Sequence, residues 1–251
     1  MKTHPETFLG RLALATRPPR PWLRIQSSSS WWTQVLLAGG ARHSMAGADL
    51  TGTDLTYKDL AGADLTDTDL TGADLTGTDL TSANLRNADL AGAHLTDANL
   101  RNADLTDAHL TDAKLRNADL RGADLFRAYL TYADLVGADL TGADLTGTDL
   151  AGADLTDAHL TGAHLIDAKL TYANLTRVDL AGADLTGADL TDTNLTDTNL
   201  MEVTWSEWTR WPNSVALVMR GRSVPIGDGR YRVQGSGTSG TDLSIPPVPV
   251  S

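Results

Sequence analysis

The sequence has no cysteine, and residues 46–200 contain no proline, no glutamate and no tryptophan. Without cysteine the chain can form neither a disulfide nor a thiolate metal site. The longest apolar run of the N-terminal region, Val35–Ala38, is far too short to span a bilayer or to form the core of a signal peptide. We therefore expect a cytoplasmic protein with no membrane segment.

Residues 46–200 are built from a repeat of five residues. Leucine occupies every fifth position from Leu50 to Leu200, 31 times without exception. The residue two places before each leucine is Ala, Thr or Val, except at Lys58, and the residue between them is mostly Asp or Asn. A helix would spread these leucines over all its faces, and a flat strand would alternate them between two sides because five is odd.

The repeat therefore predicts a chain that turns a corner every five residues. If the leucine is position i, residues i−2 and i point inward and i−1 points outward, while i+1 and i+2 form the corner. All 14 glycines between residues 46 and 200 fall at i+2, where tight turns need unusual backbone angles. The absence of proline fits a stack in which each layer donates its N–H groups to the next.

These residues resemble the A(D/N)LXX pattern of the pentapeptide-repeat family over about 155 of the 251 residues. The resemblance implies an all-β fold, a right-handed quadrilateral parallel β-helix in which four repeats make one coil and residues 20 apart stack. With coils about 4.8 Å apart, the repeats would form nearly eight coils and a solenoid roughly 37 Å tall.

The composition divides the chain into four predicted segments. Residues 1–44 are rich in Pro, Ser and Trp and carry six Lys or Arg against one Glu. We interpret them as a largely disordered extension, with a dedicated binding arm as the alternative. We expect the β-helix at 45–204, a C-terminal cap at 205–233, and a disordered Gly/Ser/Pro-rich tail at 234–251.

The cap segment is predicted from its tryptophans. The end of a solenoid exposes its last layer of core and its unpaired strand edges, and these must be covered. We expect Trp205, Trp208 and Trp211 to do this. We also expect Val215–Val218 to pair with Tyr231–Val233 as a hairpin.

The sequence does not predict an enzyme. The carboxylates recur as part of the repeat, and no two of them are distinguished as an acid and a base. The histidines of the repeat, His94, His109, His159 and His164, all take the outward position and are expected to be solvated. No phosphate-binding loop or nucleophile motif is present, so we expect no cofactor and no metal.

Charge is the distinctive property of the predicted surface. Residues 46–200 carry 27 Asp and nine Lys or Arg, for a net charge of −18. Over roughly 37 Å this is about one negative charge per 2 Å, and duplex DNA carries one per about 1.7 Å. Direct binding to nucleic acid is therefore not expected. The predicted stacking places Asp49, Asp69 and Asp89 in one column, and Asp104, Asp124 and Asp144 in another.

Two functions are compatible with this sequence. The first is a non-enzymatic structural or protein-interaction rod whose partner is not identified. The second follows from the resemblance, which implies a DNA mimic, because some members of the family bind DNA gyrase and protect it from quinolones. No particular oligomeric state is predicted. A candidate interaction patch of exposed aromatic and basic residues consists of Arg121, Phe126, Arg127, Tyr129, Tyr132 and Val136.

Overall fold

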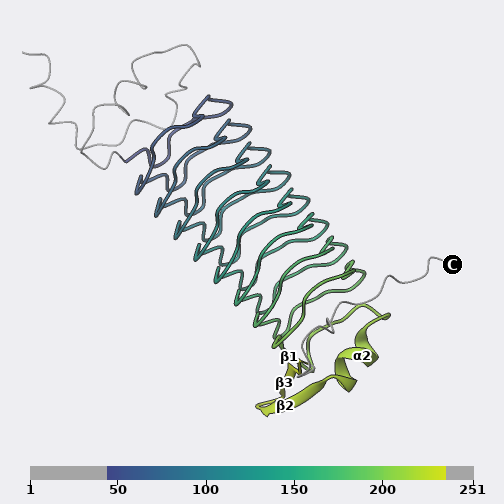
Figure 1. The fold of residues 1–251 in the computed structure, drawn as a ribbon. Coiled ribbons are helices and arrows are strands. Elements are labelled where there is room, and N and C mark those ends of the chain that lie inside the picture. The colour runs from purple at the N-terminus through teal and green to yellow at the C-terminus, as the bar shows by residue number, and fades with distance from the viewer. Residues whose placement is uncertain (1–43, 236–251) are drawn as a thin grey trace, which may run out of the picture.

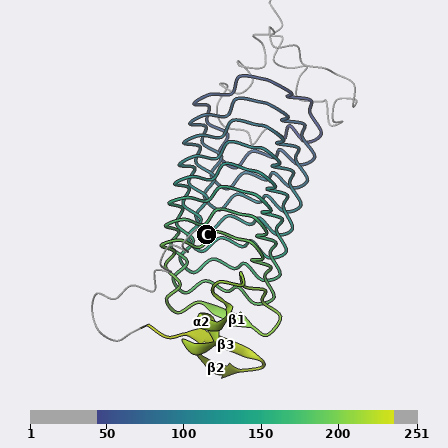
Figure 2. The same ribbon diagram turned by 90° about the vertical axis from the view of Figure 1, so that its right-hand side faces the viewer.

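The computed structural model describes residues 44–235, and the predictions for the extension before residue 44 and for the tail after residue 235 lie outside this range. The described chain winds into an elongated stack of coils, with residues 201–235 at one end of it (Figures 1 and 2). From Ser44, which pairs with Asp64, to Asp184, which pairs with Thr204, each outward residue forms a parallel bridge with the residue 20 positions on. Four repeats therefore make one coil, and the fold is a solenoid.

Backbone hydrogen bonds run from coil to coil in every repeat. The Leu70 N–H donates to the Asp89 carbonyl at 2.7 Å, and the Gly72 N–H donates to the Ala91 carbonyl at 2.9 Å. Within the coil, the Ala73 N–H donates to the Leu70 carbonyl at 2.9 Å and closes the corner. Gly72 has a φ of 61°, so the corner has the hydrogen bond and the positive third φ of a type II turn.

The core is formed by the inward residues, as the repeat predicts. Leu65 to Leu190 are at most 1% exposed, and alanines fill the space between the leucine columns. Each buried leucine contributes about 1.5–3 kcal/mol before conformational entropy is counted. Threonine replaces alanine without leaving a buried polar atom unpaired: the Thr78 hydroxyl, for example, donates to the Leu55 carbonyl one coil earlier at 2.7 Å.

The C-terminal end contains the only regular strands and the only α-helix among residues 44–235. These are β1 (Thr204–Ser206), α2 (Ala216–Gly221), β2 (Ser223–Gly227) and β3 (Arg230–Val233), and the sheet has the antiparallel order β1-β3-β2. Trp205 stacks on Tyr231 with ring centroids 4.7 Å apart and meets Trp211 edge to face. Its indole N–H donates to the Ser223 hydroxyl at 2.9 Å.

The prediction that Trp208 helps to cover the core is wrong, because its side chain is 75% exposed. Asp189 pairs with Arg210, which is 21 positions on rather than 20, so the last turn contains one extra residue. That residue moves Thr209 into the inward position, where its hydroxyl donates to the Leu185 carbonyl at 2.8 Å. Trp208 is thereby rotated onto the corner.

The predicted hairpin partner is also wrong. Val215 is the N-cap of α2 and Ala216–Val218 lie within this helix, and β3 pairs with β2 instead. Pro225 sits in β2 opposite Tyr231, and β2 lies at the edge of the sheet, where a residue without an N–H is tolerated. Within residues 44–235, no helix is both long enough and apolar enough to cross a membrane.

Candidate interaction surface

The exterior has four faces, which we call A to D after the columns of outward residues that stack through the parallel bridges. Each corner takes the names of the two faces that it joins. The columns are Asp64, Asn84, Asp104, Asp124, Asp144, His164 and Asp184 on face A; Asp49, Asp69, Asp89, His109, Tyr129, Asp149, Lys169 and Asp189 on face B; Asp54, Asp74, His94, Lys114, Asp134, Asp154, Asn174 and Asn194 on face C; and Asp59, Asp79, Asn99, Asp119, Asp139, His159, Asp179 and Asn199 on face D.

The outward Asp and Asn residues have a structural role that the sequence analysis missed. In 24 of the 31 repeats the outward residue is Asp or Asn, and in each of these its Oδ1 accepts the backbone N–H two residues on. This is the one backbone N–H of the repeat that neither bonds to a neighbouring coil nor closes the corner. Asp and Asn side chains commonly hydrogen-bond to the backbone two residues on, and this preference could have predicted the role from the sequence.

Seven repeats give up this hydrogen bond. Their outward residues are His94, His109, Lys114, Tyr129, His159, His164 and Lys169. Within residues 44–235, the N–H groups two residues after them have no hydrogen-bond partner. Three of the seven, His109, Tyr129 and Lys169, lie on face B. The fold therefore does not require His, Lys or Tyr at these seven outward positions.

Both predicted acidic columns are present as stacks. Asp49, Asp69 and Asp89 follow one another on face B, and Asp104, Asp124 and Asp144 do so on face A. Asp104 also receives Arg86 at 3.3 Å. Burial acts to raise the pKa of Asp104, but hydrogen bonds from Thr106 and Arg86 outweigh it and hold the pKa below its usual value.

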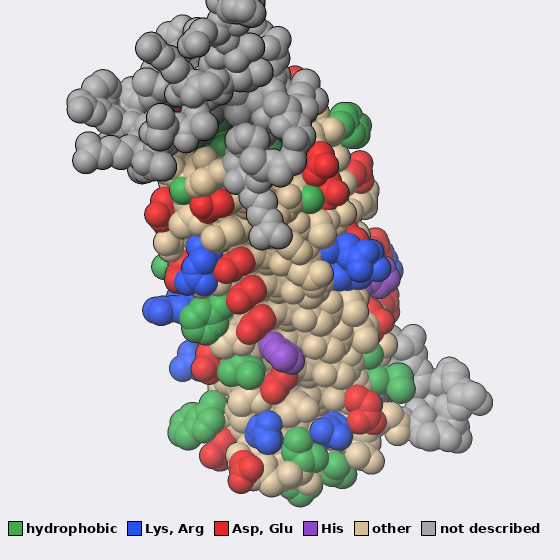
Figure 3. All heavy atoms as spheres, turned by 90° about the vertical axis from the view of Figure 1, so that its left-hand side faces the viewer, with side chains coloured by type: hydrophobic (Ala, Val, Ile, Leu, Met, Phe, Trp, Pro, Cys, Tyr) green, Lys and Arg blue, Asp and Glu red, His purple; other side chains and the backbone are tan. Residues whose placement is uncertain are grey.

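Basic side chains interrupt the acidic surface. Figure 3 shows one side of the molecule, on which a short row of acidic side chains (red) has Lys or Arg (blue), apolar (green) and His (purple) side chains near it. The ion pairs that join neighbouring coils include Arg116–Asp134, Lys169–Asp149 and Arg177–Asp157. Exposed pairs of this kind add little to stability, about 0–1 kcal/mol each, but they break up the negative field.

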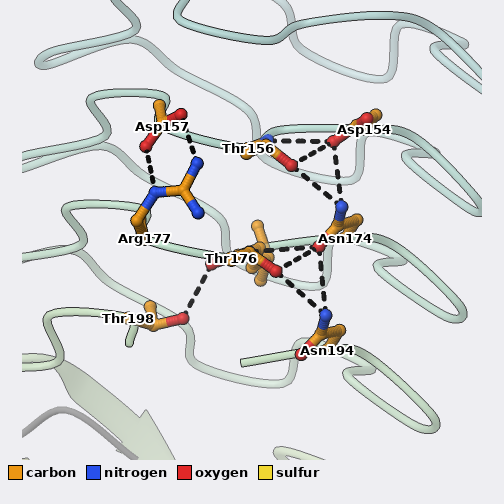
Figure 4. A network of polar contacts seen from close by, with 9 residues as sticks. Asp154, Thr156, Asp157, Asn174, Thr176, Arg177, Asn194 and Thr198 are labelled. Carbon is orange, nitrogen blue, oxygen red and sulfur yellow. Dashed lines mark hydrogen bonds and ion pairs between the residues drawn. The ribbon is translucent and has the colours of Figure 1, made fainter. Parts of the chain in front are cut away.

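Asparagine joins successive coils on face C without adding charge (Figure 4). The Asn174 amide donates to Asp154 Oδ1 at 3.2 Å, and the Asn194 amide donates to Asn174 Oδ1 at 3.2 Å. Beside this column, the Arg177 guanidinium donates two hydrogen bonds of 2.6 Å to Asp157. The hydrogen bonds from Arg177 lower the pKa of the Asp157 carboxyl.

The predicted interaction patch is distributed over the four corners. Phe126 and Arg127 form the A–B corner, Tyr129 is the outward residue of face B, and Tyr132 belongs to the B–C corner. Val136 follows on the C–D corner. Arg121 lies on the D–A corner, where it pairs with Asp119 and with Asp139 at 3.6 Å. The structure therefore brings only four of the six residues together, around face B.

The rings around face B are held in place by their neighbours. Tyr129 stacks on His109 of the preceding coil with centroids 4.8 Å apart. The Arg127 guanidinium carbon lies 5.9 Å from the centre of the Phe126 ring, within reach of a cation–π interaction. A Cβ added to Gly152 would overlap the Tyr132 ring, so Tyr132 lies directly against the glycine of the following coil.

The resolved pKa shifts of the described carboxyl groups all have one direction. Every carboxyl group with a resolved shift, including Asp54, Asp64, Asp119 and Asp189, has its pKa lowered, whereas a general acid at neutral pH needs a raised one. For Asp119 the cause is the hydrogen bond from Arg121. Nowhere in residues 44–235 do three His, Asp or Glu side chains gather as a metal site.

The five-residue repeat, the bridges 20 residues apart and the filled leucine core define a four-sided solenoid protein. The family model for pentapeptide repeats matches in eight copies, over residues 44–81, 83–122, 123–162 and 163–200. The chain therefore belongs to the pentapeptide-repeat family, which confirms the resemblance seen in the sequence, and its fold is the right-handed quadrilateral β-helix of that family. Pentapeptide-repeat proteins are generally structural or interaction proteins.

Several solved structures are similar to this chain. HetL, a pentapeptide repeat protein involved in heterocyst differentiation regulation in the cyanobacterium Nostoc, is 30% identical, with 72% of this chain and 89% of HetL covered and a TM-score of 0.40. A pentapeptide repeat protein of the Arabidopsis thaliana thylakoid lumen is 35% identical, over 45% of this chain and 71% of that one, with a TM-score of 0.36.

A trypsin-treated form of QnrB1, a plasmid-mediated fluoroquinolone resistance protein, is 21% identical, covers 72% of this chain and 92% of its own, and has a TM-score of 0.51. At this identity the likeness concerns the fold alone. No curated protein matches this chain.

Proposed function

We propose that this protein is a non-enzymatic interaction rod that presents side chains to a protein partner. The observation that carries this proposal is the separation of roles within each repeat. The inward residues and the backbone ladder build the scaffold, while outward and corner positions vary around it, from Asp to Tyr, Arg and Lys. A scaffold that tolerates such changes at regular intervals suits the display of a binding surface.

The absence of an enzymatic role is part of this proposal. It is supported by the filled leucine core, by carboxylates whose resolved pKa values are shifted downward, and by the even spread of acidic groups over the exterior. We also propose a cytoplasmic location.

The proposed function is tested by affinity capture with the full chain as bait. The control bait is the Leu120→Asp variant, which places a charge in the core and should unfold locally. We expect at least one protein to be retained by the parent and not by the variant, and to bind again as a purified protein with saturation. If every captured protein binds the two baits equally, the interaction rod is not supported.

A DNA-mimicking inhibitor of gyrase is the second candidate, and the stacked acidic columns are the observation in its favour. Replacing Asp104, Asp124 and Asp144 by Asn removes three charges from face A but keeps each acceptor for the backbone N–H. The same change at the face B column of Asp49, Asp69 and Asp89 is the matched control. A mimic presents one face, so the two variants should inhibit supercoiling unequally. Absence of inhibition by the parent would exclude this function.

The finer architecture is also a proposal. We propose that the repeat forms nearly eight coils, which is supported by the unbroken series of bridges from Ser44 to Arg210. We further propose that the C-terminal segment caps the core. This is supported by the burial of Trp205 and Trp211 and by their contacts with each other and with Tyr231.

A further inference from the structure

The charge of the rod is not uniform along its length. Residues 86–127, which we call the central belt, carry six of the nine Lys or Arg of the repeat and seven Asp, for a net charge of −1. Residues 46–85 have a net charge of −7, and residues 128–200 have a net charge of −10. The central belt therefore lies between two strongly acidic segments, and it is where an anion meets the least repulsion from the rod.

Within the central belt, face C combines two cationic side chains with two unpaired backbone donors. His94 and Lys114 occupy successive outward positions and are joined by a parallel bridge. Neither of them supplies the side-chain oxygen that accepts the backbone N–H in 24 other repeats. The N–H groups of Thr96 and Arg116 consequently have no hydrogen-bond partner within residues 44–235. We call these four residues the face C site.

The two unpaired N–H groups lie close together and point outward. The Asp97 N–H donates to the Arg116 carbonyl at 2.9 Å, so the two corners are adjacent and the unpaired N–H groups lie about 4.8 Å apart. In an ordinary repeat of face C, the equivalent N–H of Thr76 donates to Asp74 Oδ1 at 3.1 Å. The N–H groups of Thr96 and Arg116 therefore point to where the fold elsewhere places a carboxylate oxygen.

Lys114 is left without an ion pair because its acidic neighbour has another partner. Asp134, the next outward residue of face C, receives the Arg116 guanidinium at 3.3 Å. Lys114 forms no salt bridge within residues 44–235, and the side chains of Lys114 and His94 are both exposed. The Lys114 ammonium is therefore available to an anion that comes from outside the chain.

The other carboxylates near the site define what kind of anion it could hold. They belong to Asp74, to Asp97, which accepts the Asn117 amide at 3.2 Å, and to Asp112. Their repulsion has to be overcome by direct hydrogen bonds, so a suitable ligand accepts several of them at once. A phosphate group offers three strong acceptor oxygens and nearly two negative charges, whereas a carboxylate offers two oxygens and one charge.

Face B has a similar pair of donors but no free ammonium group beside it. The N–H groups of Thr111 and Thr131 are unpaired within residues 44–235. The outward residues there, His109 and Tyr129, stack on each other with ring centroids 4.8 Å apart. The lysine of that face lies two coils further on and is already ion-paired. Face B therefore serves as an internal comparison for the contribution of the unpaired N–H groups alone.

We propose that the face C site binds a phosphate group. The N–H groups of Thr96 and Arg116 each donate to a phosphate oxygen, and the Lys114 ammonium pairs with the negative charge. His94, when protonated, donates a further hydrogen bond. Successive backbone N–H groups that point to one place are a common way of holding phosphate. The proposal goes beyond the interaction function and does not depend on it, because both free phosphate and a phosphorylated protein carry the group.

The test titrates the full ¹⁵N-labelled chain with sodium phosphate at constant ionic strength and follows the amide signals by NMR. We expect saturable shifts of the Thr96 and Arg116 amides. In the His94→Asn, Lys114→Asn variant, both N–H groups gain the side-chain acceptor that Asn provides in other repeats, so the fold is kept. The phosphate affinity of this variant should fall about tenfold or more.

The matched control is the His109→Asn, Tyr129→Asn variant, which gives the two N–H groups of face B the same acceptors. Its phosphate affinity should equal that of the parent. Acetate, as a second probe, should bind about tenfold more weakly than phosphate. N-acetyl-O-phosphoserine amide, as a third, distinguishes the sources of the group. Affinity equal to that of phosphate supports a phosphorylated protein as the ligand, and exclusion of this ester supports free phosphate.

Equal phosphate affinity of the parent and the His94→Asn, Lys114→Asn variant would overturn the site. Shifts spread evenly over all seven unpaired N–H groups would also overturn it, because they would indicate a general effect of the added ions. If acetate binds as tightly as phosphate, the phosphate assignment is wrong. If no saturable shift is seen, the proposal fails, while the interaction rod is still judged separately by affinity capture.

Discussion

Removing one outward carboxylate should destabilise the solenoid through the backbone rather than through charge. Asp144 accepts the Thr146 N–H at 2.9 Å on face A. Asp144→Asn keeps an acceptor in the same place, whereas Asp144→Ala leaves that N–H to water. We expect Asp144→Ala to cost about 1 kcal/mol, since the group is partly exposed and water can replace part of the bond. Asp144→Asn should be nearly neutral.

The size of this effect can be set against a core change at the next residue. Leu145 is 1% exposed, and Leu145→Ala should cost about 2–5 kcal/mol through lost transfer energy and the cavity left behind. For a chain of this size about 1 kcal/mol shifts the unfolding midpoint by roughly 2–4 °C. Thermal unfolding followed by circular dichroism would separate the three variants.

Hydrogen exchange provides the site-specific readout. In the parent the Thr146 amide should be protected. The Ile166 amide one coil on, which follows His164 and lacks this acceptor, should exchange rapidly. Asp144→Ala should bring Thr146 to the rate of Ile166. If the Asn and Ala variants share one midpoint and one Thr146 exchange rate, the outward carboxylates are not structural and the argument is refuted.

Three further outcomes are expected. Leu120→Asp should lower the unfolding midpoint far more than Asp119→Asn, because it buries an unpaired charge, and similar midpoints would contradict the inward assignment. Truncation after Leu200 should cause concentration-dependent association visible in sedimentation, and a monomeric product would count against capping. Arg121→Ala should raise the pKa of Asp119 toward its usual value in an NMR titration, because Arg121 donates the hydrogen bond that lowers it. The lowered pKa of Asp119 stabilises the folded parent at pH values above the unfolded pKa of about 3.9. The parent should lose this stabilisation as the pH falls through the lower pKa of Asp119 in the folded state. If the Arg121→Ala variant loses stability with falling pH to the same extent as the parent, this role of Arg121 is contradicted.

The solenoid could be predicted from the sequence because its signal is repeated 31 times. One leucine every five residues, with glycine confined to i+2, fixes which residues point inward. The outward aspartates were interpreted only as charge, although their side chains commonly bond a backbone N–H two residues on. That role is local and could have been derived from the repeat alone.

The C-terminal end could not be predicted in the same way because nothing in it repeats. The single extra residue before Arg210, which exposes Trp208, comes after the last regular repeat and leaves no periodic pattern in the sequence. Pro225 lies in β2, and a proline is tolerated there because β2 is an edge strand. Around face B lie Phe126, Arg127, Tyr129 and Tyr132, whereas Arg121 and Val136 lie on other corners. This grouping became visible only when each residue was assigned to a face or a corner.

Because one coil takes 20 residues, the number of residues between two side chains decides on which face or corner of the rod each of them lies. Deleting one repeat from the middle of the rod would preserve the inward leucines, but it would turn every later side chain by a quarter circle. Tyr132 and Tyr172 both lie on the B–C corner. After the deletion Tyr172 would lie on a different corner from Tyr132, while the leucine core would stay filled. Deleting four repeats would restore the line and bring the two rings closer by one coil. Evolution can therefore rotate or slide a binding surface by insertion and deletion alone, without altering a single residue that forms it.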